Sequence, residues 1–149
     1  MEALLANPAF RIYALCSAIL GVKMLASAVY TGTRRQQVGG FVNPEDAKTF
    51  GSSGVEAKPE EAPEVARALR IQRNDLENIP LFFAIGLIYV LTGASPFGAV
   101  VLCGLFTLAR VAHTLVYIRG LQPARAICFV TGAACTLIMI FRIVVNVLL

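Results

Sequence analysis

The sequence has few charged residues and lacks the short motifs of the common nucleotide-dependent and hydrolytic enzymes. Asp, Glu, Lys and Arg together make up only 15% of the chain. There is no glycine-rich phosphate loop, no nucleophile elbow and no internal repeat. No basic stripe with interleaved aromatic residues lies outside the apolar segments, so nucleic acid is not an expected partner.

The cysteines also lack the spacing of a metal or redox site. The chain has four, none of them in a Cys-x-x-Cys pair, and all four lie within apolar segments: Cys16, Cys103, Cys128 and Cys135. Cysteine in such surroundings usually packs as a small apolar side chain. We therefore expect no metal centre in this protein.

Long apolar segments dominate what is present. Hydrophobic residues make up 57% of the chain and the mean hydropathy is +0.71, whereas soluble domains are about 45–50% apolar. Four segments have the length needed to cross a bilayer: residues 10–30, 64–91, 96–118 and 124–148. An Ala-Ser-Ala sequence at 26–28 resembles a cleavage site, but the acidic start and Lys23 favour a retained first span. We predict an all-α, integral membrane four-helix bundle that forms one domain over residues 1–149.

The basic residues predict which loops face the cytoplasm. They concentrate in the first and third loops, at Arg34, Arg35, Lys48, Lys58 and Arg119. By the positive-inside rule these two loops are cytoplasmic. The first loop, at about 33–63, is expected to be an irregular flap, with a turn or helix start at Asn43-Pro44-Glu45-Asp46. Pro80 is expected to bend the second span.

One helical face of the second span predicts an anion site. Its members recur at i, i+3, i+4 and i+7: Arg70, Arg73, Asn74 and Glu77. Arginines bind carboxylates through paired hydrogen bonds, and Glu77 could hold an ammonium group. Glutathione fits this set of groups, whereas a phospholipid headgroup or an inorganic anion leaves Glu77 unexplained.

The third span carries a second polar face, formed by Arg110, His113 and Tyr117. Two interpretations stay open at this point. These side chains could satisfy one another inside the bundle, or they could line the same pocket as the first face, with Arg125 at the same depth.

Four motifs, in order, resemble the MAPEG family of membrane-associated eicosanoid and glutathione enzymes. They are Phe41-x-Asn43-Pro44-Glu45-Asp46, Arg70-x-x-Arg73-Asn74-Asp75-Leu76-Glu77-Asn78, Arg110-x-x-His113-Thr114 and Gln122-Pro123-x-Arg125-Ala126. The similarity runs over nearly the whole chain and is greatest to the branch holding the microsomal glutathione transferase and the prostaglandin E synthase.

The resemblance implies homotrimers with glutathione, as co-substrate, bound between neighbouring subunits. The implied glutathione contacts are Arg35, Arg70, Arg73, Asn74, Glu77, His113, Tyr117 and Arg125, with Arg125 next to the sulfur. Asp46 matches an aspartate that is sometimes assigned a catalytic part. Some positions depart from relatives: Gln72 stands in place of histidine, Phe129 in place of tyrosine, Ala126 in place of the synthase serine and Ala47 in place of a cysteine that senses modification.

The resemblance therefore implies a membrane-bound glutathione transferase and peroxidase. Its expected substrates are lipophilic electrophiles and lipid hydroperoxides, and its site faces the cytoplasm from a bacterial inner membrane or the endoplasmic reticulum. Two alternatives stay open: a glutathione-dependent isomerase of the prostaglandin E synthase type, and a non-enzymatic lipid-binding accessory protein.

Overall fold

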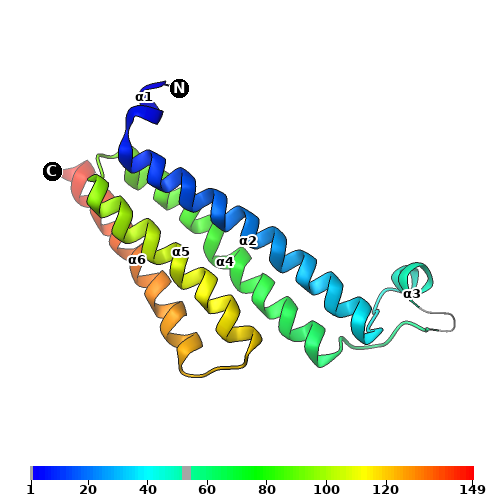
Figure 1. Ribbon diagram of the computed structural model, residues 1–149. Helices are drawn as coiled ribbons and strands as arrows, with labels where there is room; N and C mark the ends of the chain where they lie inside the picture. Colours follow the sequence, from blue (N-terminus) through cyan, green and yellow to red (C-terminus); the bar gives the residue numbers. More distant parts are fainter. Residues whose placement is uncertain (1, 52–54) are drawn as a thin grey trace. The chain divides into compact units, whose positions relative to one another are not determined.

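The computed structural model describes residues 2–51 and 55–149, and helices are the only regular elements in those two ranges. The helices are α1 (Glu2–Ala6), α2 (Pro8–Val38), α3 (Pro44–Phe50), α4 (Pro63–Leu91), α5 (Pro96–Ile118) and α6 (Ala124–Leu148) (Figure 1). Four of them, α2, α4, α5 and α6, are long and apolar enough to cross a membrane. The predicted all-α fold with four spans is confirmed.

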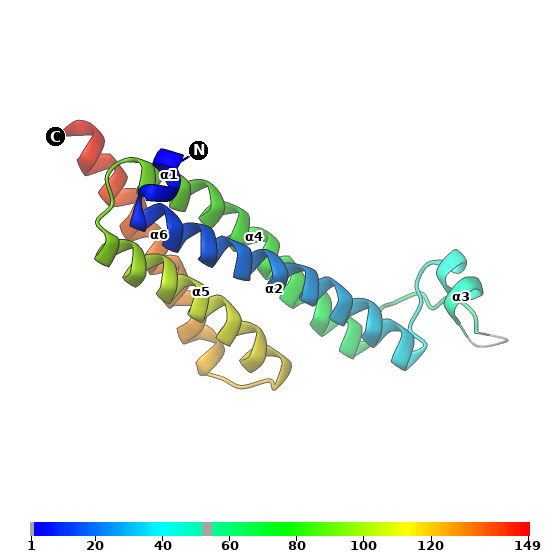
Figure 2. The same cartoon turned by 45° about the horizontal axis from the view of Figure 1, so that its top comes forward.

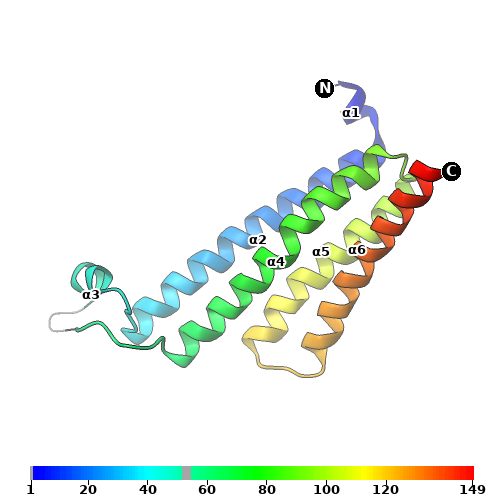
Figure 3. The same ribbon diagram turned by 180° about the vertical axis from the view of Figure 1, so that it is seen from behind.

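The chain forms two units, which are described in turn. The first unit runs to Lys23 and resumes at Asp75, and the second runs from Met24 to Asn74. The first unit therefore contains the start of α2, the end of α4, and all of α5 and α6. Figures 2 and 3 show α5 and α6 running antiparallel beside each other, joined by a short turn.

Aromatic side chains join neighbouring helices inside the first unit. Tyr13 of α2 donates its hydroxyl to the Phe83 carbonyl of α4 at 2.8 Å. Phe82 of α4 stacks on Phe106 of α5, with ring centroids 4.3 Å apart. On α6, the amide of Asn146 donates to the carbonyl of Thr92, just beyond α4. These contacts join α2 to α4, α4 to α5, and α6 to the residue that follows α4.

The outer surface of this unit is apolar. Large hydrophobic side chains are exposed on α5 and α6, for example Phe97, Leu108 and Phe141. Exposed apolar side chains around helices that satisfy their own backbone hydrogen bonds are expected in contact with lipid. With the four long apolar helices, they define an integral, multi-pass membrane protein.

In the second unit, α2 continues eight residues past the predicted span, which ended near residue 30. The helix stops at Gly39, whose φ of 57° lies in the left-handed region that favours glycine. The Gly39 N–H donates to the Gln36 carbonyl and the Gly40 N–H to the Arg35 carbonyl, which is the hydrogen-bond pattern of a Schellman motif. The prediction of a loop from about residue 33 is therefore wrong at its start, and Arg35 lies in the last turn of a helix.

The first loop also contains a short helix, α3. Asn43 has the extended backbone of an N-cap, and Pro44 takes the first helical position. Glu45 and Asp46 lie in the first turn, where negative charges interact favourably with the helix dipole. The helix start predicted at these residues is confirmed, and it opens one short helix within the first loop. Residues 52–54 of the predicted loop lie outside the described residues.

Candidate functional site

The predicted ligand face lies on consecutive turns of α4. The side chains of Arg70, Arg73 and Glu77 are exposed and that of Asn74 is half-buried. Because α4 is one uninterrupted helix from Pro63 to Leu91, the i, i+3, i+4, i+7 spacing keeps these four side chains on one side of it. This side of the helix presents polar groups outward from the single chain.

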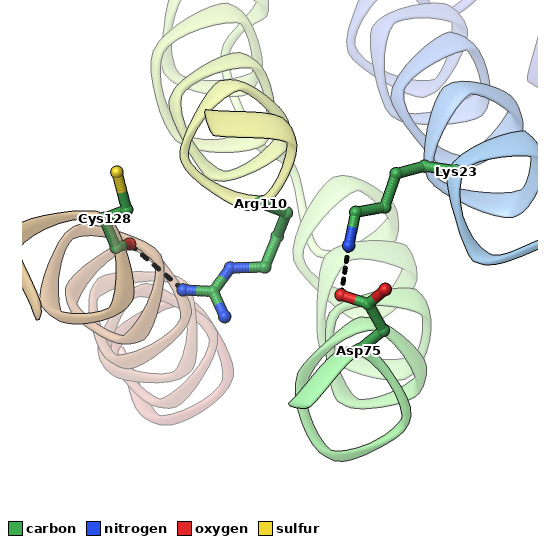
Figure 4. Close-up of polar contacts among 4 residues, drawn as sticks. All are labelled: Lys23, Asp75, Arg110 and Cys128. Atoms are coloured by element: carbon green, nitrogen blue, oxygen red, sulfur yellow. Dashed lines mark hydrogen bonds and ion pairs between the residues drawn. The ribbon is translucent and has the colours of Figure 1, made fainter. Parts of the chain in front are cut away.

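Asp75, which follows Asn74, lies on the opposite side of α4 and points into the bundle. Asp75 is only 1% exposed, and its carboxylate accepts a hydrogen bond from Lys23 of α2 in a buried ion pair. Figure 4 shows the two side chains directed toward each other from α2 and α4. Paired burial of this kind holds two opposite charges away from lipid, where a lone charge is costly.

Arg110 of α5 is fully buried in the same unit and is directed toward α6 (Figure 4). Its Nη2 donates to the backbone carbonyls of Cys128, at 3.1 Å, and Phe129, at 3.0 Å. Its guanidinium also lies over the rings of Phe106 and Phe129. Of the two interpretations left open for the third span, the structure favours the internal one for Arg110.

A further polar cluster lies where α5 ends and α6 begins. His113 is 3% exposed, and its ring meets the edge of the Tyr117 ring one turn later, with centroids 5.5 Å apart. The Arg125 guanidinium lies over the Tyr117 ring, 4.5 Å from its centroid. Tyr117 and Arg125 are both half-buried, so this cluster connects the interior with the end of the bundle.

The two remaining predicted residues belong to the second unit and have partners there. Arg35 Nη2 lies 2.6 Å from Glu61 Oε1 in a half-buried ion pair. Asp46 Oδ2 accepts a hydrogen bond from Asn43 Nδ2 at 3.1 Å. Arg35 therefore already binds a carboxylate of its own chain, and Asp46 stabilises the start of α3.

The structure brings three predicted residues into contact: His113, Tyr117 and Arg125. The predicted residues that belong to the second unit are described within that unit alone: Arg35, Asp46, Arg70, Arg73 and Asn74. Their approach to the cluster of His113, Tyr117 and Arg125 stays a prediction. Sequence reasoning missed Glu61 and the buried partnership of Lys23 with Asp75. The missed signal is positional: Lys23 follows the buried residues Tyr13, Cys16 and Leu20 at intervals of three and four, and Asp75 lies midway between buried Ile71 and Ile79.

These features define a class: a multi-pass membrane protein built as a helical bundle with ionised side chains paired inside it and a cationic cluster at one end. Comparison with known proteins narrows the class. The MAPEG family model matches residues 13–145, and the chain belongs to the MAPEG family.

Two groups of relatives align over most of the chain. Human microsomal glutathione S-transferase 1 is 42% identical over 141 residues, covering 91% of this chain and 86% of that protein. The bovine protein of the same name is 37% identical over 146 residues, covering 96% and 94%. Human prostaglandin E synthase is 36% identical over 126 residues, covering 84% and 81%. The family resemblance inferred from the motifs is confirmed.

Proposed function

We propose that this protein is a membrane-bound glutathione transferase that also reduces lipid hydroperoxides. The observation that carries the proposal is the half-buried guanidinium of Arg125, held over the Tyr117 ring at the junction of α5 and α6. A fixed cation at this place suits a thiol substrate, because a guanidinium beside sulfur lowers the thiol pKa and favours the thiolate. The similarity to microsomal glutathione S-transferase 1 supports glutathione as that thiol.

The other predicted residues would hold the two ends of glutathione. Arg70, Arg73 and Arg35 offer guanidinium groups to its carboxylates, and Glu77 offers a carboxylate to its ammonium group. Asn74, His113 and Tyr117 add hydrogen-bonding and ring contacts. For Arg35 the ligand would have to share or displace Glu61, with which it is paired at 2.6 Å. A catalytic part for Asp46 stays a prediction.

In the proposed reactions the thiolate attacks a substrate that arrives through the bilayer. With a chlorinated nitrobenzene, sulfur bonds to the ring carbon and chloride leaves. With a hydroperoxide, sulfur takes the terminal oxygen and the alcohol leaves. The resulting sulfenic acid then condenses with a second glutathione, giving the disulfide and water. Neither reaction needs a metal.

We further propose that the protein is a homotrimer whose site faces the cytoplasm. The exposed charged side of α4 supports a subunit interface there, because two arginines and a glutamate are costly in contact with lipid. The basic residues at positions 34, 35, 48, 58 and 119 support the cytoplasmic orientation.

A glutathione-dependent isomerase is the second candidate, favoured by the similarity to prostaglandin E synthase. Ala126 argues for the transferase, because a methyl side chain cannot assist a thiol or donate a proton as a hydroxyl does. A transferase that needs only a stabilised thiolate has no such requirement.

The test measures three reactions with the same purified protein at saturating glutathione. We expect conjugation of a chlorinated nitrobenzene and reduction of a lipid hydroperoxide, with little isomerisation of a prostaglandin endoperoxide. Efficient isomerisation with negligible conjugation would promote the second candidate. Activity in none of the three assays, with lipid bound, would favour the accessory protein.

The same preparation tests the role of Arg125. Arg125→Ala should lower the bound thiolate, followed by its ultraviolet absorbance at neutral pH, about tenfold or more, which corresponds to a rise of at least one unit in the thiol pKa. Arg119→Ala removes an exposed cation from the turn between α5 and α6 and is the matched control. Its thiolate signal should be unchanged. Equal losses in both variants would reduce the role of Arg125 to general surface charge.

A further inference from the structure

The turn between α5 and α6 contains a second partner for Arg125. In the amide orientation that satisfies both groups, Gln122 Oε1 accepts hydrogen bonds from Arg125 Nη2 at 2.6 Å and from Arg125 Nε at 2.9 Å. These two N–H groups lie on one edge of the planar guanidinium. A single oxygen that accepts from both therefore fixes which edge of Arg125 faces Gln122 as well as the distance between the two side chains.

Gln122 and Tyr117 restrain Arg125 in different directions. Arg125 Cζ lies over the Tyr117 ring, 4.5 Å from its centroid, so the ring limits movement of the guanidinium toward that side. Gln122 holds the Nε edge and limits rotation within the plane of the guanidinium. A guanidinium has five N–H donors, and Gln122 takes two of them. The three that remain are two on Nη1 and one on Nη2, and the edge between these two nitrogens can bind an anion by two parallel hydrogen bonds.

We propose that Gln122 is a positioning residue, which aims the edge between Nη1 and Nη2 of Arg125 at the sulfur of glutathione. This inference rests on the proposed function and deepens it. The side chain is well suited to the task, because a neutral amide restrains the arginine and leaves its positive charge available to the thiolate. A carboxylate at the same place would make the same hydrogen bonds and neutralise that charge.

The comparison of two substitutions tests the proposal. Gln122→Glu retains both acceptor contacts and adds a negative charge, so the bound thiolate at neutral pH should fall about tenfold and recover as the pH is raised. Gln122→Leu removes the acceptor and lets Arg125 rotate. We expect its kcat to fall roughly tenfold, the scale of one charged hydrogen bond, with a smaller change in the KM for glutathione, whose ends are held by other residues.

The chain offers a matched control in another glutamine and arginine pair. Gln37 Oε1 accepts a hydrogen bond from Arg34 Nη1 at 3.2 Å on the exposed end of α2. Gln37→Glu adds the same charge to the same kind of pair and should leave the thiolate signal, kcat and the pH profile unchanged.

The possible outcomes separate the inference from the function beneath it. If the unsubstituted protein gives no bound thiolate, the proposed function fails and the inference fails with it. If it gives a thiolate that neither Gln122 variant alters, Gln122 only shapes the turn and the function stands. A lower melting temperature without a changed thiolate pH profile has the same meaning. If Gln122→Leu does not fold, Gln122→Glu decides, since it keeps the contacts.

Discussion

Removing one partner of the Lys23 and Asp75 ion pair should destabilise the protein far more than removing both. Asp75 is 1% exposed and the Lys23 side chain 9% exposed. Either Lys23→Met or Asp75→Leu removes from the other charge the oppositely charged group that it contacts inside the bundle. Loss of one member of a buried pair typically costs about 3–5 kcal/mol in unfolding free energy. The double substitution removes both charges of the pair, so it should lie within about 1–2 kcal/mol of the unsubstituted protein.

The assay is a double-mutant cycle on the unfolding free energy. Each variant is unfolded in mixed detergent micelles, under conditions where refolding is reversible, and followed by far-ultraviolet circular dichroism. The sum of the two single losses should exceed the loss in the double variant by several kcal/mol. Additive losses below about 1 kcal/mol each would refute the reasoning, because exposed pairs behave in that way.

The half-buried Arg35 and Glu61 pair supplies a matched control for the cycle. Its side chains are 26% and 25% exposed, so water shares in solvating both charges. The same double-mutant cycle on Arg35 and Glu61 should give a coupling energy below about 1 kcal/mol. A similar coupling in both pairs would mean that burial does not set the strength of the interaction.

Two further predictions follow from the same geometry. A Cβ built on Gly132 would lie 2.8 Å from Arg110 Nε, so Gly132→Ala should displace the guanidinium from the α6 carbonyls and lower the unfolding free energy by about 1–3 kcal/mol. Gly104→Ala is the control, because nothing lies within 4 Å of the new Cβ, and it should be neutral or stabilising. An equal change in unfolding free energy for both variants would mean that Arg110 moves without a cost in stability. Cysteines introduced at Lys58 and at Ser95, the exposed N-cap residue of α5, should be labelled from opposite sides of the membrane, Lys58→Cys from the cytoplasm. The reverse pattern would overturn the proposed orientation.

The helix starts that precede apolar runs could be predicted from the sequence almost to the residue. Pro96 and Ala124 begin α5 and α6 where the hydropathy prediction began them. Pro96 takes the first turn of α5 and Pro123 precedes Ala124, and the fixed φ of proline suits a helix start. The end of α2 was missed, because its last turn is polar and hydropathy reports lipid contact. Gly39, whose left-handed backbone ends the helix, was the local signal.

The candidate site could be predicted only in part, because spacing along a helix is local and pairing between helices is not. The spacing of residues 70, 73, 74 and 77 predicted a shared side of α4 correctly. Sequence spacing could not choose a partner for Arg35, which lies 26 residues before Glu61. It also could not separate Arg110, held by two carbonyls of α6, from His113, which contacts Tyr117.

The buried ion pair and the ligand face are linked through the rotation of α4. Asp75 lies in line with buried Ile71 and Ile79, while Arg73 and Glu77 lie on the exposed side. A shift of one residue in the register of α4 would turn the helix by about 100°; in one direction it would bring Arg67 and Arg70 to the buried positions of Ala68 and Ile71. Because a buried ammonium group is stabilised most by an anionic partner, pairing of Lys23 with Asp75 favours one rotation, as buried polar residues select register in coiled coils. The apolar double variant therefore separates stability from register: we expect it to keep its unfolding free energy and to bind glutathione more weakly. Unchanged affinity would assign the rotation of α4 to apolar packing alone.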